Sequence, residues 1–265
     1  MAGVPFWVVH RTGSRVFLLG EVVGLRDDQL WLTDEIRAAV AASRELWREA
    51  DRDSLQASPL LAAHVLSDEP LSEWLDETQR RALDGVARGV GIDPVSLQGF
   101  RPWAAGQVIE QAWRTRAGMD PDLGVDAVIA GLAADAGIPV RFELGDERAT
   151  FSWFTGMGRQ LEVDYLMWTL ERVSRGDHDN DELVAGWLGG DLAFADAQDR
   201  EMRRDHPALH DRLLVERNRA WIPRISAMLE QPGTTFVLVG GAHLAGDHSI
   251  LDHLTQAGLQ PTQIT

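Results

Sequence analysis

Three residues able to carry chemistry stand near the ends of apolar segments that read as strands. They are His243, Glu49 and Glu143. The run before His243, residues 235–239, carries no charge and is followed by two glycines. Open α/β sheets place their reactive groups in the loops beyond the carboxyl ends of strands, where a rigid scaffold positions them and solutes can reach them. If the strands are parallel, Glu49 lies beside the glycine loop that carries His243.

Each of these residues also has a purely structural interpretation. His243 could cap the helix expected after it, and Glu143 could simply emerge into solvent. The chain contains no cysteine, so thiolate nucleophiles, disulfides and cysteine-ligated zinc are excluded. A metal ion could therefore be held only by histidine, aspartate and glutamate.

An earlier segment, residues 15–24, repeats the arrangement of an apolar strand, a glycine and a loop. In this first copy Val23 occupies the third position after Gly20, where the second copy has His243 after Gly240. If both strands belong to one sheet, the two glycine loops could face each other across one crevice. Residues 6–9 and 15–19 flank a five-residue connection with a glycine and are predicted to form a hairpin.

The remaining segments predict helices packed around this sheet. Thr33 followed by two acids indicates a helix start, residues 54–119 have helical spacing of apolar side chains, and 123–144 reads as a helix followed by a strand. We expect Pro102 to interrupt the helices, with another starting at Gln107. The segment 176–181 reads as a polar loop, and residues 258–264 read as a short edge strand.

These elements predict an α/β fold with a central mixed β-sheet, built from two strand-glycine-loop halves and surrounded by helices. The four core strands are expected at residues 16–19, 46–48, 140–142 and 236–239. We expect one domain spanning residues 1–265, with a helical layer at about residues 54–119 inserted, because 265 residues with 45% hydrophobic content can build a substantial core.

Composition narrows the class of partner. A net charge of −16 disfavours nucleic acid, whose binding depends on lysine and arginine. No run approaches the roughly 18 to 20 apolar residues that span a bilayer, and the chain as given begins without a signal-peptide pattern. The expectation is a soluble cytoplasmic protein, or a periplasmic one if a signal peptide has been removed.

Short motifs in a fixed order cover nearly the whole chain. They are Phe6-Trp7-Val8-Val9, Val16-Phe17-Leu18-Leu19-Gly20, Leu46-Trp47-Arg48-Glu49-Ala50-Asp51, Pro102-Trp103, Gly124-Val125-Asp126, Phe142-Glu143, Trp187 through Gly190-Asp191, Glu216-Arg217-Asn218 and Val239 through Gly246. This order resembles the TraB/PrgY/GumN family, whose distant relatives include the Tiki metalloproteases.

The resemblance implies a G-x-x-H motif after the first core strand, a glutamate after the next and a second G-x-x-H motif near the end, which in Tiki-like members are thought to hold a divalent metal for hydrolysis. Glu49 matches the glutamate and His243 matches the second histidine, but Val23 replaces the first. A catalytic zinc-type site needs about three protein ligands, and Glu21 could supply a third. We expect one divalent ion, manganese, cobalt or zinc, bound weakly if at all.

Two function hypotheses follow. In the first the protein is a metal-dependent, protease-like hydrolase in which Glu49 binds the metal or acts as base, and Arg217 stabilises developing negative charge. In the second it is a catalytically inactive member that binds a peptide or small molecule in the same cleft. The candidate ligand-binding residues are Gly20, Asp126, Glu143 and Asn218.

Overall fold

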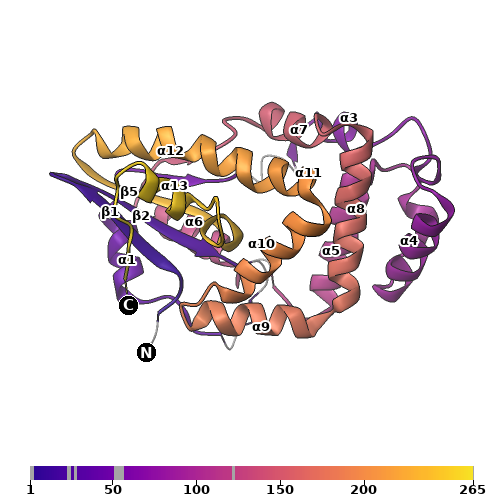
Figure 1. The fold of residues 1–265 in the computed structure, drawn as a ribbon, viewed down its shortest axis with the longest axis horizontal. Coiled ribbons are helices and arrows are strands. Elements are labelled where there is room, and N and C mark those ends of the chain that lie inside the picture. The colour runs from indigo at the N-terminus through magenta and orange to yellow at the C-terminus, as the bar shows by residue number, and fades with distance from the viewer. Residues whose placement is uncertain (1–2, 23–24, 27–28, 51–56, 121–122, 265) are drawn as a thin grey trace. The chain divides into compact units, whose positions relative to one another are not determined.

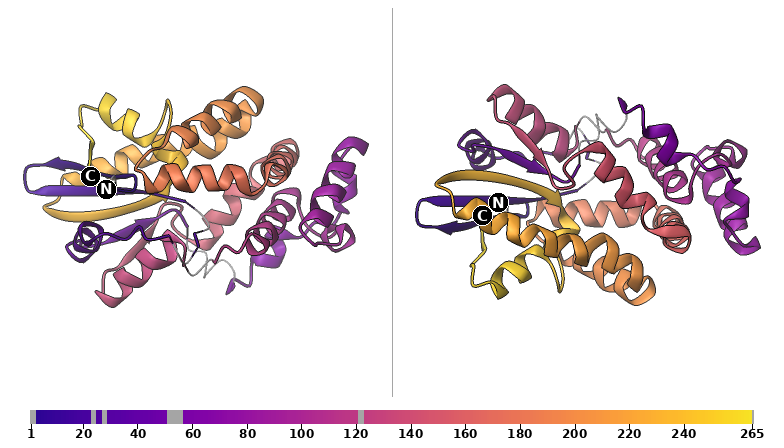
Figure 2. Two further views of the ribbon diagram at one scale, coloured as in Figure 1. Left: turned by 90° about the horizontal axis from the view of Figure 1, so that it is seen from below. Right: turned by 90° about the horizontal axis from the view of Figure 1, so that it is seen from above.

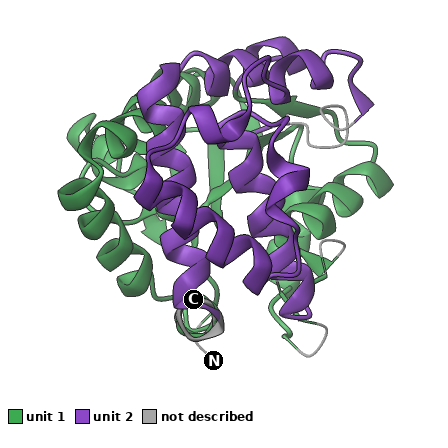
Figure 3. Cartoon of the chain, turned by 90° about the vertical axis from the view of Figure 1, so that its right-hand side faces the viewer, with its two compact units in different colours: residues 1–49, 120–143, 180–265 green, residues 50–119, 144–179 purple. Residues whose placement is uncertain are grey.

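The computed structural model describes residues 3–22, 25–26, 29–50, 57–120 and 123–264. The chain divides into two compact units (Figure 3). The sheet unit contains residues 1–49, 120–143 and 180–265, and the helical unit contains residues 50–119 and 144–179. The helical unit thus includes the predicted layer at 54–119 together with a second segment. The single-domain description of residues 1–265 stays a prediction, because compactness does not show whether a unit folds alone.

The described part of the sheet unit contains a six-stranded mixed sheet with the order β4-β3-β5-β2-β1-β6. The pairs β2–β5, β5–β3 and β3–β4 are parallel, while β1–β2 and β1–β6 are antiparallel. The predicted hairpin, edge strand and four core strands are all present, so the predicted α/β class is confirmed. The strands are β1 (Phe6–Arg11), β2 (Ser14–Glu21), β3 (Leu46–Arg48), β4 (Val140–Phe142), β5 (Gly233–Gly240) and β6 (Thr262–Gln263).

Helices cover both faces of this sheet (Figures 1 and 2). The helical segments of the sheet unit are α1 (Asp34–Ala41), α6 (Val125–Asp135), α10 (Ala193–Asp205), α11 (Pro207–His210), the π-helical turn Asp211–Val215, α12 (Glu216–Leu229), the 3-10 turn Gly241–Leu244 and α13 (Ile250–Gln256), with α9 (Asp177–Leu188) crossing into it. Thr33 caps α1 as predicted, accepting a hydrogen bond from the Ile36 amide.

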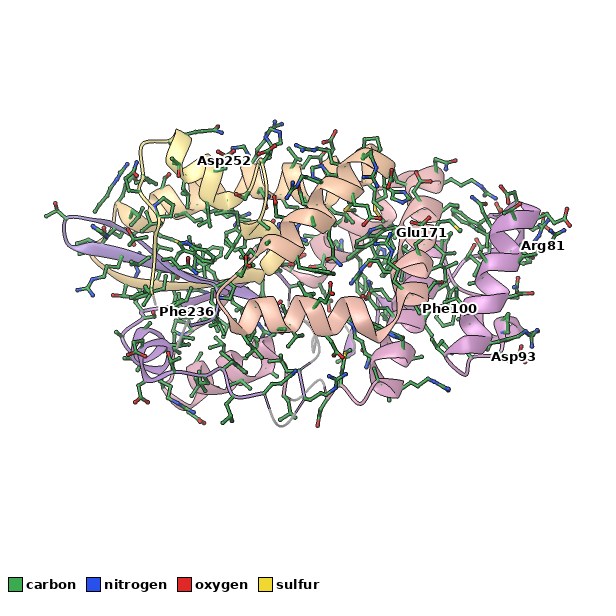
Figure 4. The ribbon with its side chains drawn as sticks, turned by 60° about the horizontal axis from the view of Figure 1, so that its bottom comes forward. Arg81, Asp93, Phe100, Glu171, Phe236 and Asp252 are labelled. Carbon is green, nitrogen blue, oxygen red and sulfur yellow. The ribbon has the colours of Figure 1, made fainter. Side chains whose placement is uncertain are left out.

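Residues 236–239 of strand β5 are all apolar, because both faces of the strand are buried there. Phe236, labelled in Figure 4, and Leu238 pack into the core that includes α1 and α6. Val237 and Val239 point the other way, into the core with α12 and α13. Successive strand residues alternate between faces, so a parallel strand covered on both sides reads as a continuous hydrophobic run.

The helical unit is built on the pairing of α5 with α8 and has its own apolar core. Its elements are α3 (Leu61–Val65), the 3-10 turns Leu71–Glu73 and Pro94–Leu97, α4 (Glu77–Gly89), α5 (Pro102–Arg116), α7 (Glu147–Thr155) and α8 (Gly158–Arg175).

Two local predictions are wrong. Pro102 does not interrupt a helix but begins α5. The first helical position suits proline, whose missing amide hydrogen would have no partner there and whose φ is already helical. The segment predicted as a polar loop, 176–181, belongs to α9 from Asp177 onward. Only Gly176, with a φ of 75°, separates it from α8, and acidic residue types are favourable in the first turn of a helix.

A helix that spans a bilayer must be long and apolar over most of its length. No helix within the described ranges is long and apolar enough to cross a bilayer.

Candidate functional site

The parallel strands of the sheet unit end at one edge, and the candidate residues follow directly. Glu49 comes after β3, which pairs with β5 on one side and β4 on the other. Glu143 comes after β4, and its amide donates a hydrogen bond to the Arg48 carbonyl at 2.8 Å. The carboxyl ends of β5, β3 and β4 are therefore aligned, and they bring Glu49 beside Glu143 and the glycines of β5.

The two residues with the clearest chemical potential, Glu49 and His243, are in contact. Nε2 of His243 lies 3.4 Å from Oε1 of Glu49, although 194 positions separate them (243 − 49). The amide of Gly240 also donates to this Oε1, at 2.6 Å. The alignment of parallel strand ends predicts this approach, and the contact confirms it. The metal-ligand role of the two side chains stays a prediction.

Arg217, from the first turn of α12, joins two carboxylates at this edge. Its Nη2 donates to Oε2 of Glu49 at 3.0 Å and to Oε2 of Glu143 at 2.6 Å, and its Nε donates to Glu143 at 3.2 Å. The Glu143 side chain is only 2% exposed, against 25% for Glu49. Arg217 therefore compensates one deeply buried carboxylate and one that solvent can reach.

The charges of this group shift the pKa values in different directions. Burial would raise the pKa of Glu49, but the charges of Arg217 and His243 and the Gly240 amide together lower it to about 2. Burial raises the pKa of Glu143, and Arg217 only partly opposes this. Burial would lower the pKa of Arg217, but the two carboxylates raise it. Glu49 is thus ionised at neutral pH.

His243 is held in the 3-10 turn after β5 and is 4% exposed. Burial lowers its pKa to about 4, since the opposing effect of Glu49 is smaller and Arg217 adds to the lowering. Its Nδ1 lies 2.6 Å from Oδ1 of Asn218 on α12. We call Glu49, Glu143, Arg217, Asn218 and His243 the strand-end cluster.

Asp126 is not brought into the strand-end cluster. It forms an ion pair with Arg48, whose Nε donates to Oδ1 of Asp126 at 2.6 Å. Arg48 and Glu49 are neighbours near the end of a strand and so point to opposite faces. Asp126, on α6, lies on one face, while Arg217 and Asn218, on α12, lie on the other.

Gly20 and Glu21 end β2, next to the strand-end cluster. Glu21 is 9% exposed and pairs in the sheet with Gly240, whereas Gly20 pairs with Val239. Gly20 and Gly240 are therefore offset by one residue in the register of the sheet. Val23 lies outside the described residues. Within the described ranges, no group of three or more histidine and acidic side chains is arranged to hold a metal ion.

Gly20 has a structural reason to be glycine, and this gives a first prediction. A Cβ at this position would lie 3.1 Å from Cδ1 of Leu244 and 3.3 Å from Cα of Gly241. We expect Gly20→Ala to destabilise the protein by about 1–3 kcal/mol, because backbone must shift to accept it. Gly131→Ala in α6, where a Cβ meets nothing within 4 Å, is the control and should stabilise by about 0.5–1 kcal/mol. Urea unfolding measures both, and equal effects would contradict the packing argument.

The low pKa of His243 predicts a pH dependence of stability. Between its ordinary value of 6.5 and about 4 the unfolded chain binds a proton that the folded chain does not. Stability is therefore fully present above this window and falls as the pH drops through it. We expect the wild-type protein to lose roughly 2 kcal/mol more than His243→Gln between pH 7 and pH 4.5, within the limit of about 1.4 kcal/mol per pH unit for one proton. Urea unfolding at both pH values provides the comparison, and parallel losses would show that His243 is not the group responsible.

Sequence reasoning missed two backbone contributions to the strand-end cluster. One is the Gly240 amide bound to Glu49, and the other is the carbonyl of His248, which accepts a hydrogen bond from Nδ2 of Asn218 at 2.9 Å. The glycine pair at the end of β5, Gly240 and Gly241, is a signal for close backbone approach. His248 has a left-handed φ of 65°, a conformation that its residue type does not predict.

The fold and the strand-end cluster define an α/β protein with polar and ionisable groups gathered beyond its parallel strands. A family model described as the TraB/PrgY/gumN family matches residues 5–263. The chain therefore belongs to this family. It is also 22% identical, over 266 residues, to an uncharacterized protein of Treponema pallidum (strain Nichols), a match covering 93% of this chain and 79% of that protein. No solved structure matches the chain.

Proposed function

We propose that this protein is a hydrolase that uses Glu49 and His243 with a weakly held divalent metal ion. The observation that carries the proposal is the 3.4 Å separation between Nε2 of His243 and Oε1 of Glu49. On a neutral His243 that already has a proton on Nδ1, Nε2 presents a lone pair to a carboxylate oxygen. Two electron-rich atoms at this distance attract a cation between them.

The separation suits a shared metal ion. Two donors about 2.1 Å from one ion at a tetrahedral angle lie about 3.4 Å apart. Imidazole suits zinc and cobalt, and a carboxylate also suits manganese. The pair supplies two ligands where catalytic sites have about three, so the donor set fits an ion held weakly. A bound divalent ion would polarise a carbonyl and make a water molecule a better nucleophile.

The pKa of Glu49 favours a ligand role over a general-base role. A good general base has a pKa near the working pH, and the pKa of Glu49 is lowered to about 2. The Glu49 carboxylate therefore stays ionised at neutral pH and accepts a proton only weakly. Arg217 holds Glu49 in place from the other side, with Nη2 3.0 Å from Oε2, which leaves Oε1 directed toward Gly240 and His243.

A second candidate function has its own observation. Arg217 contacts both Glu49 and Glu143, so the site is partly charge-balanced by the chain itself. In this alternative the protein is a catalytically inactive family member that binds a peptide or small molecule at the same edge of the sheet.

The number of metal ions bound per chain separates the two functions. Manganese, cobalt and zinc are each titrated into the wild-type protein and into Glu49→Ala, followed by calorimetry and by metal analysis after gel filtration. Glu45→Ala is the control, because Glu45 lies next to the same strand and pairs with Arg44 and Arg141 instead. One ion lost only with Glu49→Ala, together with peptide or ester hydrolysis that depends on it, supports the hydrolase. No ion on the wild-type protein supports the binding protein.

A further inference from the structure

We propose that Asn218 is a positioning residue that keeps the ring proton of His243 on Nδ1, and that the backbone of His248 sets the orientation of Asn218. The inference rests on the proposed function only for its purpose, which is to leave Nε2 of His243 free to bind a metal ion. The positions of the protons follow from contacts that need no metal ion and no substrate.

The carbonyl of His248 decides which way the Asn218 amide faces. Its oxygen lies 2.9 Å from the Asn218 side-chain nitrogen, and a carbonyl oxygen can only accept a hydrogen bond. Turning the amide over would place two oxygens against each other at that distance. Nδ2 of Asn218 therefore donates to His248, and Oδ1 faces His243.

The orientation of the amide then determines the tautomer of His243. Nδ1 of His243 lies 2.6 Å from Oδ1 of Asn218, which has only lone pairs to offer. The contact is a hydrogen bond only if Nδ1 carries the proton. On a neutral ring, Nε2 is then unprotonated and directed at Oε1 of Glu49, 3.4 Å away. Without Asn218, a proton on Nε2 would be favoured, because it could bond to the Glu49 carboxylate.

The backbone of His248 is itself fixed by the start of α13. Its amide donates to Oδ2 of Asp252, labelled in Figure 4, at 3.2 Å. Ser249 caps the same helix by accepting from the Asp252 amide at 3.1 Å. Among the described residues, His248 alone has a left-handed φ without being glycine. Such conformations cost free energy and persist where surrounding contacts hold them.

These contacts connect the N-terminal cap of α13 to Glu49 through His248, Asn218 and His243. The second nitrogen of a metal-binding histidine commonly donates to a fixed acceptor, which orients the ring and leaves the other nitrogen free to bind. Asn218 provides that acceptor here. It acts through His243 and has no need to touch a substrate.

Nitrogen-15 NMR of the imidazole rings at neutral pH tests the proposal in the metal-free protein. His243→Gln identifies the His243 signals by their disappearance. We expect the wild-type ring to show a protonated Nδ1 and an unprotonated Nε2. In Asn218→Leu, of similar volume, the Nε2 signal should move toward the protonated range and the Nδ1 signal away from it. His248→Gly keeps the carbonyl and relieves the left-handed strain, so it should retain the wild-type tautomer.

Several results would overturn the proposal. A wild-type His243 with its proton on Nε2, or with both nitrogens protonated at neutral pH, contradicts it whether or not Asn218→Leu folds. An unchanged tautomer in a folded Asn218→Leu protein, judged by its amide spectrum, shows that Asn218 is only structural. The proposed hydrolase can fail separately, because a wild-type protein that binds no metal can still carry the Nδ1-protonated ring.

Discussion

Replacing Arg217 by methionine is expected to destabilise the sheet unit by about 3 kcal/mol or more. The substitution keeps an unbranched side chain but removes the positive charge between Glu49 and Glu143. Glu143 is 2% exposed and would be left as a buried carboxylate without its principal partner. Breaking a buried ion pair costs about 3–5 kcal/mol, because the remaining charge has lost both its hydration and its partner. Urea unfolding at pH 7 measures the loss.

Two further variants make the prediction specific to burial. Arg200→Met removes an arginine from an exposed pair with Asp196 on α10, in the same unit, and should cost less than about 1 kcal/mol. Adding Glu143→Met to Arg217→Met should recover much of the lost stability, because an apolar replacement for the pair leaves no buried charge. If Arg217→Met costs no more than Arg200→Met, Arg217 does not compensate Glu143 in the way the contacts indicate.

The sheet was predictable because short local sequence patterns indicate its strands. The run 236–239 is apolar on both faces of β5, and the hairpin and the edge strand were marked by turn residues or by position. The helix boundaries at Pro102 and Asp177 were not, since proline and acidic segments occur both in loops and at helix starts. Only the surrounding chain decides between these outcomes.

The strand-end cluster was predictable in part. The approach of Glu49 to His243 follows from parallel strands ending at one edge, and Arg217 and Asn218 came from the family resemblance. The sequence did not show that Asp126 lies on the other face of the sheet. That face depends on which way Arg48 and Glu49 point from their strand and on which face α6 covers. The orientation of Asn218 depends on one carbonyl of a left-handed residue, which no spacing rule reveals.

Arg217 also bears on how the protein can bind metal. Its guanidinium lies 3.0 Å from the Glu49 carboxylate whose other oxygen faces His243. A positive charge this close lowers the affinity of the carboxylate for a cation, because like charges repel over a few ångströms in a partly buried site. With two ligands and a neighbouring arginine, weak binding is the expected state of the unaltered chain. A third ligand should therefore have a large effect.

Val23→His is expected to strengthen the binding of manganese, cobalt or zinc by at least about tenfold, or ~1.4 kcal/mol. The sequence places Val23 three positions after Gly20, where the family motif has its first histidine. An imidazole there would raise the number of protein ligands from two toward the usual three. It would also replace an apolar side chain, which has no donor atom to substitute for the water molecules that solvate the ion. Isothermal titration of the wild-type and Val23→His proteins with each ion measures the change.

The controls distinguish a completed site from an additional surface histidine. Leu30→His places an imidazole at a position that is 92% exposed and should leave the affinity unchanged. Adding Glu49→Ala to Val23→His should remove the gain, because the new histidine is expected to share its ion with Glu49. Equal affinities of the wild-type and Val23→His proteins would contradict the prediction, and the one-residue offset between Gly20 and Gly240 in the sheet would account for the new ring missing the ion. Tight one-to-one binding by the wild-type chain that is lost with Glu21→Ala would show instead that Glu21 already serves as the third ligand, and would favour the hydrolase.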